Sequence, residues 1–510
     1  MALLKAITSF GHTLPRSAAE LLPWNLSHTK IRGNGLHGIL IKQFSSGELI
    51  HGSSEWRMVR PATPDEISYE KFHRCYSRQG IGCFVYNSRK ALDEDMWRKA
   101  LRHATNKIEG LRLCLHESDE KHWLCEVKNH DIDFKIIENK TILEVMDDMK
   151  NEGIDHSFWS ARVVPGGVCA IPELRKEFPH QYAFNFKFHH GLLDGISVAY
   201  FIRVLSVILD DLLSGKTVND DIHFGKYIFD DPLEIKTKET QQALDSDPIR
   251  LDEERERILA LTMKQPILYS AYPKPKGIQS TTHHIVKEVD NSKVKALYKS
   301  CKAKKLNMTA GFEAVFNTAL VEMVSDAGAV QDGYKINVRQ NINMRRYFEM
   351  EKDLKKFPMG PFFGGMQQGT FCTQLARKNF WEHAQEIHNN FYSLLNNNGP
   401  FIENIVRPQV EEPLDPVALA KAPPQDKSDY AFSNVTDMTP FVFYDGTQVQ
   451  LTDMVSYNYI NSFIHPMILQ FSSYRGLGQL NCSYDIAKVS DDTAHELMDR
   501  IMNLLDIVTK

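Results

Sequence analysis

The chain of 510 residues has no apolar run long enough to cross a membrane and no strongly basic segment. The closest apolar stretch starts at Ile196 and is interrupted by Arg203, whereas a membrane helix needs about 20 consecutive apolar residues. The net charge is -5, and lysine and arginine are scattered along the sequence. Such a distribution creates no concentrated positive field that would attract a polyanion. We therefore expect no transmembrane segment and no nucleic-acid partner.

Paired cysteine motifs are also missing. The eight cysteines lie far apart, form no CxxC pair and mostly sit inside apolar runs. This spacing favours reduced, buried thiols over a disulfide framework or a zinc site.

The first fifty residues have few acidic side chains, only Glu20 and Glu48, and several lysines and arginines. This composition is typical of an organellar transit peptide, but also of an extended arm before a folded body. We expect folded sequence from about Arg57 and treat 1–56 as an arm or possible transit peptide. The expected location is cytoplasmic, with a mitochondrial or other organellar location as the alternative.

Aromatic residues alternate with other residues over 182–188, a period of two that predicts a strand with one aromatic face. His190 shares the parity of these aromatics and is therefore expected on the same face. After Gly195 the apolar positions follow a helical stripe that closes at Ser214 and Gly215. The intervening segment HHGLLDG, residues 189–195, is thus predicted to be a turn from a strand into a helix.

Two regions of similar αβ composition flank a charged and poorly periodic segment. We predict an N-terminal lobe at 57–218, a crossover at 219–280 and a C-terminal lobe at 281–510. A helix is expected around 251–263 within the crossover.

A histidine on such a turn suits general-base chemistry, because imidazole titrates near neutral pH and the turn fixes its position. Gly195 is expected to free the backbone for the bend into the helix. Asp194 can hold the turn by an ion pair, since a buried carboxylate without a partner is costly. In KINVRQNINMRRYF, Arg339 is the first candidate for this partner and Arg345 the second.

The segment HHGLLDG resembles the HHxxxDG signature of nonribosomal peptide condensation domains, alcohol acetyltransferases, wax ester synthases and plant BAHD acyltransferases. Flanking segments resemble the same superfamily in the same order over about 57–505. The most distinct are INVRQNINMRRYF, FPMGPFFGGM and YAFSNVTDMTPF. The plant signature Asp-Phe-Gly-Trp-Gly is missing, which disfavours a BAHD enzyme and favours the free-standing alcohol acetyltransferase type.

The resemblance implies an α/β (α+β) fold with two chloramphenicol-acetyltransferase-like lobes, each a mixed sheet flanked by helices, and a tunnel between the lobes. It implies that His190 is the base, His189 a structural neighbour, and Asp194 an anchor that pairs with Arg339. Ser433 and Asn434 match polar positions near the developing oxyanion.

The implied reaction moves an acyl group from acyl-CoA, a co-substrate, to an alcohol or, less favoured, an amine. It proceeds in a ternary complex, without a bound cofactor, in a monomer. Two rival functions stay open: a condensation-type enzyme that takes a carrier-protein thioester, and a noncatalytic protein that holds a lipid or acylated ligand.

Several features have plainer interpretations. Adjacent histidines on a strand point to opposite faces, so a metal site at His189, His190 and Asp194 is not expected. The pair His283-His284 lacks a turn and an acidic partner in sequence, and we interpret it as surface and core filling. Core positions are favoured for Trp159 and for Phe362 and Phe363.

Overall fold

The computed structural model describes residues 56–510 except for 77–79, 119–120, 129–131, 153–157, 230–231, 349–354, 412–424 and 461–463. All described residues belong to one compact unit, His51–Lys510. The predicted arm at 1–56 therefore lies outside the described residues, apart from Trp56. No helix in the described part is both long and apolar enough to span a membrane.

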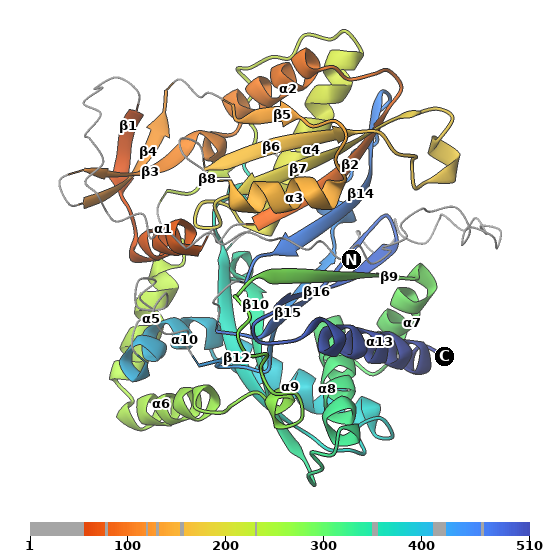
Figure 1. Ribbon diagram of the computed structural model, residues 1–510. Coiled ribbons are helices and arrows are strands. Elements are labelled where there is room, and N and C mark those ends of the chain that lie inside the picture. Colours follow the sequence, from red (N-terminus) through yellow and green to blue (C-terminus); the bar gives the residue numbers. More distant parts are fainter. Residues whose placement is uncertain are drawn as a thin grey trace. The chain divides into compact units, whose positions relative to one another are not determined.

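The first of two large sheets has five strands in the order β14-β2-β7-β6-β5. These strands are β14 (Val449–Asn458), β2 (Gly80–Ser88), β7 (His180–Phe188), β6 (Trp159–Pro165) and β5 (Phe134–Ile136). Neighbours are antiparallel except β5 and β6, which are parallel. Helices α2 (Glu94–Lys107) and α4 (Gly195–Leu213) cover one face, and α3 (Ile142–Asn151) covers the other (Figure 1).

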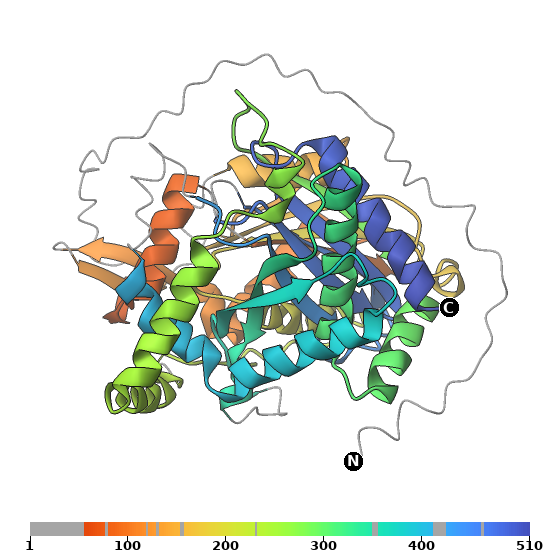
Figure 2. The same ribbon diagram turned by 90° about the horizontal axis from the view of Figure 1, so that it is seen from below.

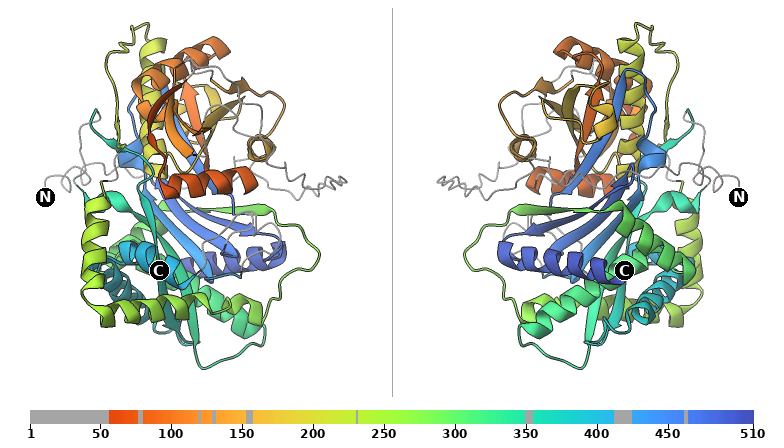
Figure 3. Two further views of the ribbon diagram at one scale, coloured as in Figure 1. Left: turned by 90° about the vertical axis from the view of Figure 1, so that its left-hand side faces the viewer. Right: turned by 90° about the vertical axis from the view of Figure 1, so that its right-hand side faces the viewer.

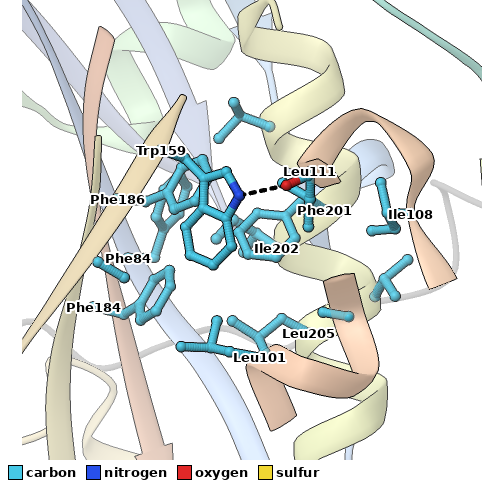
Figure 4. Close-up of a cluster of buried hydrophobic side chains, with 14 of the residues drawn as sticks. Phe84, Leu101, Ile108, Leu111, Trp159, Phe184, Phe186, Phe201, Ile202 and Leu205 are labelled. Atoms are coloured by element: carbon cyan, nitrogen blue, oxygen red, sulfur yellow. Dashed lines mark hydrogen bonds between the residues drawn. The ribbon is translucent and has the colours of Figure 1, made fainter. Parts of the chain in front are cut away.

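The core of this first lobe follows from the alternation in β7. Phe184 and Phe186 point to the same face and pack on Phe201 of α4. Trp159 is buried among them and donates a hydrogen bond from its indole nitrogen to the carbonyl of Leu111 at 2.8 Å (Figure 4). The core position predicted for Trp159 is confirmed.

The second sheet has six strands in the order β12-β10-β13-β15-β16-β9. Its strands are β12 (Phe363–Cys372), β10 (Tyr334–Asn343), β13 (Tyr430–Asp437), β15 (Met467–Tyr474), β16 (Leu477–Asp485) and β9 (Thr282–Val289). A single apolar core joins one face to four helices, which are α7 (Asn291–Ala303), α8 (Met308–Asp326), α9 (Phe380–Asn396) and α13 (Asp491–Val508). Figure 2 shows these helices in front of the strands.

One strand of the first sheet comes from the C-terminal part of the chain. β14 pairs with β2 along the whole length of both strands, from Val449 opposite Ser88 to Asn458 opposite Gly80. Figures 1 and 3 show this blue strand within the first sheet, although β13 and β15, which precede and follow it in the chain, belong to the second sheet. The segment 57–218 therefore does not complete its own sheet.

Smaller elements surround the two sheets. A three-stranded sheet joins β1 (Trp56–Pro61), β4 (Lys121–Val127) and β3 (Leu113–Ser118). Helix α1 (Pro64–Tyr76) follows β1, and the short helix α12 (Thr439–Val442) follows β13. Short 3-10 turns occur at Glu109–Arg112, Pro172–Leu174, Ile267–Ser270 and Met344–Tyr347.

The predicted crossover contains α5 (Glu234–Asp245) and α6 (Pro248–Thr262), which pack with α10 (Gly399–Val410). The helix expected around 251–263 thus corresponds to α6. In the same crossover, β8 (Lys226–Tyr227) pairs with β11 (Pro358–Met359).

The predicted α/β fold, with two mixed sheets each flanked by helices, is confirmed. Seven cysteines are described with their side chains, and all seven are buried free thiols, as expected. The lobe boundaries and the interlobe tunnel stay predictions.

Candidate active site

The segment HHGLLDG forms the predicted turn between β7 and α4. β7 ends at Phe188 and α4 begins at Gly195. The carbonyl of His189 accepts hydrogen bonds from the backbone N–H groups of Leu192 and Leu193 at 3.1 and 3.3 Å. Both leucine side chains are buried in the core of the first lobe, which anchors the turn.

His190 lies where this turn meets α1 and β12. Its ring centroid is 4.5 Å from that of Phe363, 5.8 Å from that of Phe188 and 6.1 Å from that of Tyr69. The contact with Phe188 fits the parity argument, because both residues lie on the aromatic side of β7. The residue as a whole is only partly buried, although its Nδ1 is enclosed.

His189 points away from His190 and is almost fully buried. Its Nε2 lies 3.0 Å from Oε2 of Glu70 on α1, and its Nδ1 accepts a hydrogen bond from the N–H of Gly191 at 3.2 Å. A ring nitrogen that accepts carries no proton, so this pattern assigns the proton of neutral His189 to Nε2. Phe158 and His73 pack edge-on against the ring. The ring of His189 is thus enclosed, and its role as a structural neighbour of the base stays a prediction.

The buried ion pair of Asp194 forms with Arg345, not with Arg339. Nη1 of Arg345 lies 2.5 Å from Oδ2 of Asp194, and Nη2 lies 3.1 Å from Oδ1. Such a bidentate pair fixes both position and orientation. The assignment to Arg339 is wrong because that residue lies within β10, whereas Arg345 follows the strand in a 3-10 turn that reaches the start of α4.

Further hydrogen bonds connect this pair to the segment after β11. Oδ1 of Asp194 also accepts from the N–H of Ser197 at 2.8 Å and so caps α4. The hydroxyl of Ser197 donates to the carbonyl of Gly360 and accepts from Nη2 of Arg345. Gly360 has a φ of 149°, a conformation that favours glycine. The turn that carries His190 is therefore tied to both lobes.

Gly195 does not have the role expected from the sequence. Its φ is not positive, and an added Cβ would meet no heavy atom within 4 Å. The bend into α4 is instead made by Asp194, which has an extended backbone and caps the helix. Gly191 is the crowded glycine of the motif, because a Cβ there would lie 2.9 Å from Cβ of Tyr69.

Arg339 lies on β10, opposite Gln367 of β12. Its guanidinium covers Gly365 of β12, where an added Cβ would lie only 2.1 Å from Nη2. Its guanidinium forms no hydrogen bond or ion pair with a described residue. Burial and the charge of Arg407 lower the pKa of Arg339.

Ser433 and Asn434 lie side by side on β13, and neither has a described contact with His190. The amide of Asn434 donates to Oγ1 of Thr309 at 3.0 Å, and its oxygen accepts from the N–H of Thr436 at 3.1 Å. These bonds fit a strand-end role for Asn434. The oxyanion role of Ser433 stays a prediction.

Helix α1 supplies site residues that the sequence analysis missed. Tyr69, Glu70 and His73 lie on one helical face and surround the two motif histidines. Their spacing of three and four residues was the available signal, but a face of polar residues resembles an exposed surface. Phe363 was also expected in the core, yet its ring contacts both His190 and Tyr69.

Other sequence expectations concern metals and the second histidine pair. No group of three metal-binding side chains occurs in the described part of the chain. Nδ1 of His283 lies 2.9 Å from Oδ1 of Asp491 at the surface. His284 packs between Tyr457 and Tyr459, and burial lowers its pKa to about 3. The interpretation as surface and core filling fits both residues.

A cavity of about 280 Å³ lies away from these residues, between the crossover and the segment after 424. It is lined by Gln265, Pro266, Tyr269, Pro273, Lys274, Gln425 and Asp426. Asp426 there is bound by Lys274 and Lys488. This cavity is not the tunnel expected at His190.

Solved structures with the same fold cover most of the chain at low sequence identity. The trichothecene 15-O-acetyltransferase TRI3 from Fusarium sporotrichioides aligns with a TM-score of 0.65 and 10% identity, over 89% of this chain and 96% of that chain. The first condensation domain of the CDA synthetase aligns with a TM-score of 0.60 and 11% identity, over 88% and 96%. A mutant of the starter condensation domain of rhizomide synthetase RzmA, in complex with C8-CoA, aligns with a TM-score of 0.56 and 11% identity, over 89% and 94%.

No curated protein matches the sequence. The family model described as Condensation domain matches residues 80–343, which is more than half of the chain. This match includes β2, β7, the HHGLLDG turn and β10 with Arg339. The chain therefore belongs to the Condensation domain family.

Proposed function

We propose that the protein is an acyltransferase that moves an acyl group from acyl-CoA to the hydroxyl of a small acceptor, with His190 as general base. The observation that carries this proposal is the position of His190 on a turn held by the buried pair of Asp194 and Arg345. An imidazole on a turn held this firmly, in a residue that is only partly buried, suits proton transfer near neutral pH.

In the proposed reaction both substrates are bound at once. Nε2 of His190 takes the proton of the acceptor hydroxyl while its oxygen attacks the thioester carbonyl carbon. The tetrahedral intermediate then loses the C–S bond, and His190 returns the proton to the departing thiolate. The products are an ester and free CoA, and no covalent acyl-enzyme forms.

Asp194 is a positioning residue in this mechanism. Both of its carboxylate oxygens are occupied by Arg345, and Oδ1 also accepts from Ser197. A carboxylate engaged by a guanidinium and a helix N-terminus in this way is held in place rather than poised to exchange a proton. Its contribution is to fix the turn, so that the imidazole stays within reach of the acceptor.

The choice of an ester product rests on the resemblance to free-standing alcohol acetyltransferases. One structural neighbour is itself an O-acetyltransferase, and a second was crystallised with C8-CoA. Ser433 stays the candidate donor to the oxyanion, because the amide of Asn434 is engaged with Thr309. A carrier-protein thioester as donor, and a noncatalytic binding role, are alternatives that a single incubation separates from this proposal.

The test incubates the full chain with acetyl-, octanoyl- or palmitoyl-CoA and a deproteinised cell extract, and records free CoA and new ester or amide masses. We expect one donor to give CoA release together with a new ester. The same incubation with His190→Ala should give neither product. His180→Ala, which removes an exposed histidine from the start of the same strand, should behave like the unmodified protein. CoA release that persists in His190→Ala would reject the assignment of the base.

A further inference from the structure

Arg339 lies on the same face of the second sheet as Phe363, the residue that contacts His190. Gly365 and Phe363 are two residues apart on β12, so their side-chain positions face the same way. The guanidinium of Arg339 occupies the space above Gly365. Two residues of a strand span about 7 Å. The guanidinium therefore lies about 7 Å along β12 from Phe363, whose ring contacts His190.

Gly365 is needed for this arrangement. The ideal Cβ position at residue 365 lies 2.1 Å from Nη2, 2.4 Å from Cζ and 2.8 Å from Nε of Arg339. Any side chain there would displace the guanidinium. The glycine therefore leaves room for an arginine whose guanidinium forms no hydrogen bond or ion pair with a described residue.

The two carboxylates that act on Arg339, those of Glu403 and Glu411, are both engaged by other cations. Arg407 pairs with Glu403 and Glu411, and Lys427 also pairs with Glu411. Arg257 pairs with Glu254. Arg257 also approaches Glu403, with Nη2 at 3.5 Å from Oε1. Neither Glu403 nor Glu411 forms an ion pair with Arg339.

An enclosed guanidinium without a partner is costly, which makes such a residue a candidate for ligand binding. The structure around it also shows why the charge is unfavourable. Arg339 keeps some accessible surface, yet burial is the largest cause that lowers its pKa, and repulsion from Arg407 follows. A bound anion would relieve both effects. A planar guanidinium matches a carboxylate best, through two parallel hydrogen bonds.

We propose that Arg339 binds the carboxylate of the acceptor, so that the acceptor is a hydroxy acid whose hydroxyl lies several bonds away, at His190. This inference rests on the proposed function for the position of the reacting hydroxyl. Tyr69 is the residue that contacts His190 and also acts electrostatically on Arg339, so the two positions share a neighbour.

The test measures binding without turnover. Isothermal titration calorimetry of the full chain at low salt uses ω-hydroxy acids from 4-hydroxybutanoate to 8-hydroxyoctanoate, with the matching diols as uncharged controls. We expect at least one acid to bind and its diol to bind far more weakly. Arg339→Gln should lower the affinity for the acid roughly ten- to a hundredfold, the range for a charge-assisted hydrogen bond. The affinity for the diol should not change.

Three further variants make the result specific. Arg346→Gln removes the same charge from an exposed position nearby and should keep acid binding. Arg339→Lys should recover only part of the affinity, because lysine lacks the planar pair of donors. His190→Ala should keep acid binding but lose turnover, so a failure of the proposed function and a failure of this inference give different results.

Stability gives a second measurement. If Arg339 is a binding residue without a structural partner, Arg339→Gln should not lower the urea midpoint of the ligand-free protein, because it removes a desolvated charge that forms no direct ion pair. A lowered midpoint would show a structural ion pair and overturn the inference. So would acid binding that is absent in the unmodified protein, or binding that is equal in Arg339→Gln. If Arg339→Gln binds CoA more weakly but binds the acid as before, Arg339 belongs to the acyl-CoA site. That result would also overturn the inference.

Discussion

At the scale of single residues, the site depends on one buried ion pair. Arg345 is fully buried and Asp194 nearly so, and removing one partner leaves the other as a buried charge. Such a loss typically costs about 3–5 kcal/mol, whereas replacing both partners together costs far less. The position of His190 is thus linked to global stability.

The first prediction concerns Asp194→Ala, which removes both the ion pair and the N-cap of α4. We expect a loss of about 3–5 kcal/mol in the free energy of unfolding, measured by urea denaturation. Asp93→Ala is the matched control, because Asp93 caps α2 at an exposed position and has no buried partner. Its expected cost is about 1 kcal/mol. Equal losses in the two variants would contradict a structural role for the pair.

The second prediction separates the two glycines of the motif. Gly195→Ala should keep or raise stability, by up to about 1 kcal/mol, because alanine favours a helix and meets open space at this position. Gly191→Ala should lower stability, because its Cβ would approach Tyr69 and His189 to about 3 Å. Thermal midpoints of the two variants check this order. The reverse order would mean that Gly195, and not Gly191, is the constrained glycine of the turn.

At the scale of elements, β14 is the least expected feature. It crosses from the C-terminal part of the chain and supplies the edge strand next to β2. Val449, Leu451 and Met454 of this strand belong to the core of the first lobe. Without β14, the edge of β2 and part of this core would be exposed, and such edges promote aggregation.

The third prediction follows from the position of β14, which the C-terminal part of the chain contributes to the first sheet. A fragment of residues 51–280 should be insoluble or lack cooperative unfolding, because β14 is missing from its sheet. The same fragment with residues 445–460 joined through a flexible linker should be more soluble and should recover cooperative unfolding by circular dichroism. A fragment 51–280 that unfolds cooperatively by itself would show that β14 is dispensable.

The sequence predicted the local elements well and their pairing poorly. The alternation over 182–188 and the stripe after Gly195 predicted β7, the turn and α4, because each depends on neighbouring residues. The crossing of β14 and the choice of Arg345 over Arg339 depend on contacts between residues more than a hundred positions apart. Periodicity carries no information on such pairs. Helix α1 was missed since its buried face is polar.

At the scale of the whole molecule, buried carboxyls couple folding to pH: burial raises the pKa of Asp429 and Asp453 to about 6, and that of Glu313 further. Glu313 of α8 is fully buried and accepts hydrogen bonds from Gln368 at 2.6 Å and from Gln340. Burial raises the pKa of Glu313 to about 8, against the opposing effect of these bonds. In the unfolded chain the carboxyl ionises near its ordinary value of 4.5. Unfolding between these two values therefore releases a proton.

The fourth prediction is the pH dependence that results. Stability should fall as the pH rises from 4.5 to 8, by at most about 1.4 kcal/mol per unit from this group, and level off above 8. Glu313→Gln should flatten this slope and raise the urea midpoint at pH 8. Glu382→Gln, an exposed change at the start of α9, should keep the slope. A slope that persists in Glu313→Gln would assign it to other groups.

The proposed chemistry as a whole depends on the imidazole of His190, and the turnover number tests that dependence most directly. Once a donor and an acceptor are identified, the turnover number of His190→Ala is compared with that of His180→Ala, with both variants folded by circular dichroism. We predict that His190→Ala falls by roughly a hundred- to ten-thousandfold, the usual contribution of a general base, while His180→Ala does not change. A His190→Ala variant within a few fold of the unmodified enzyme would contradict the role of His190 as the base.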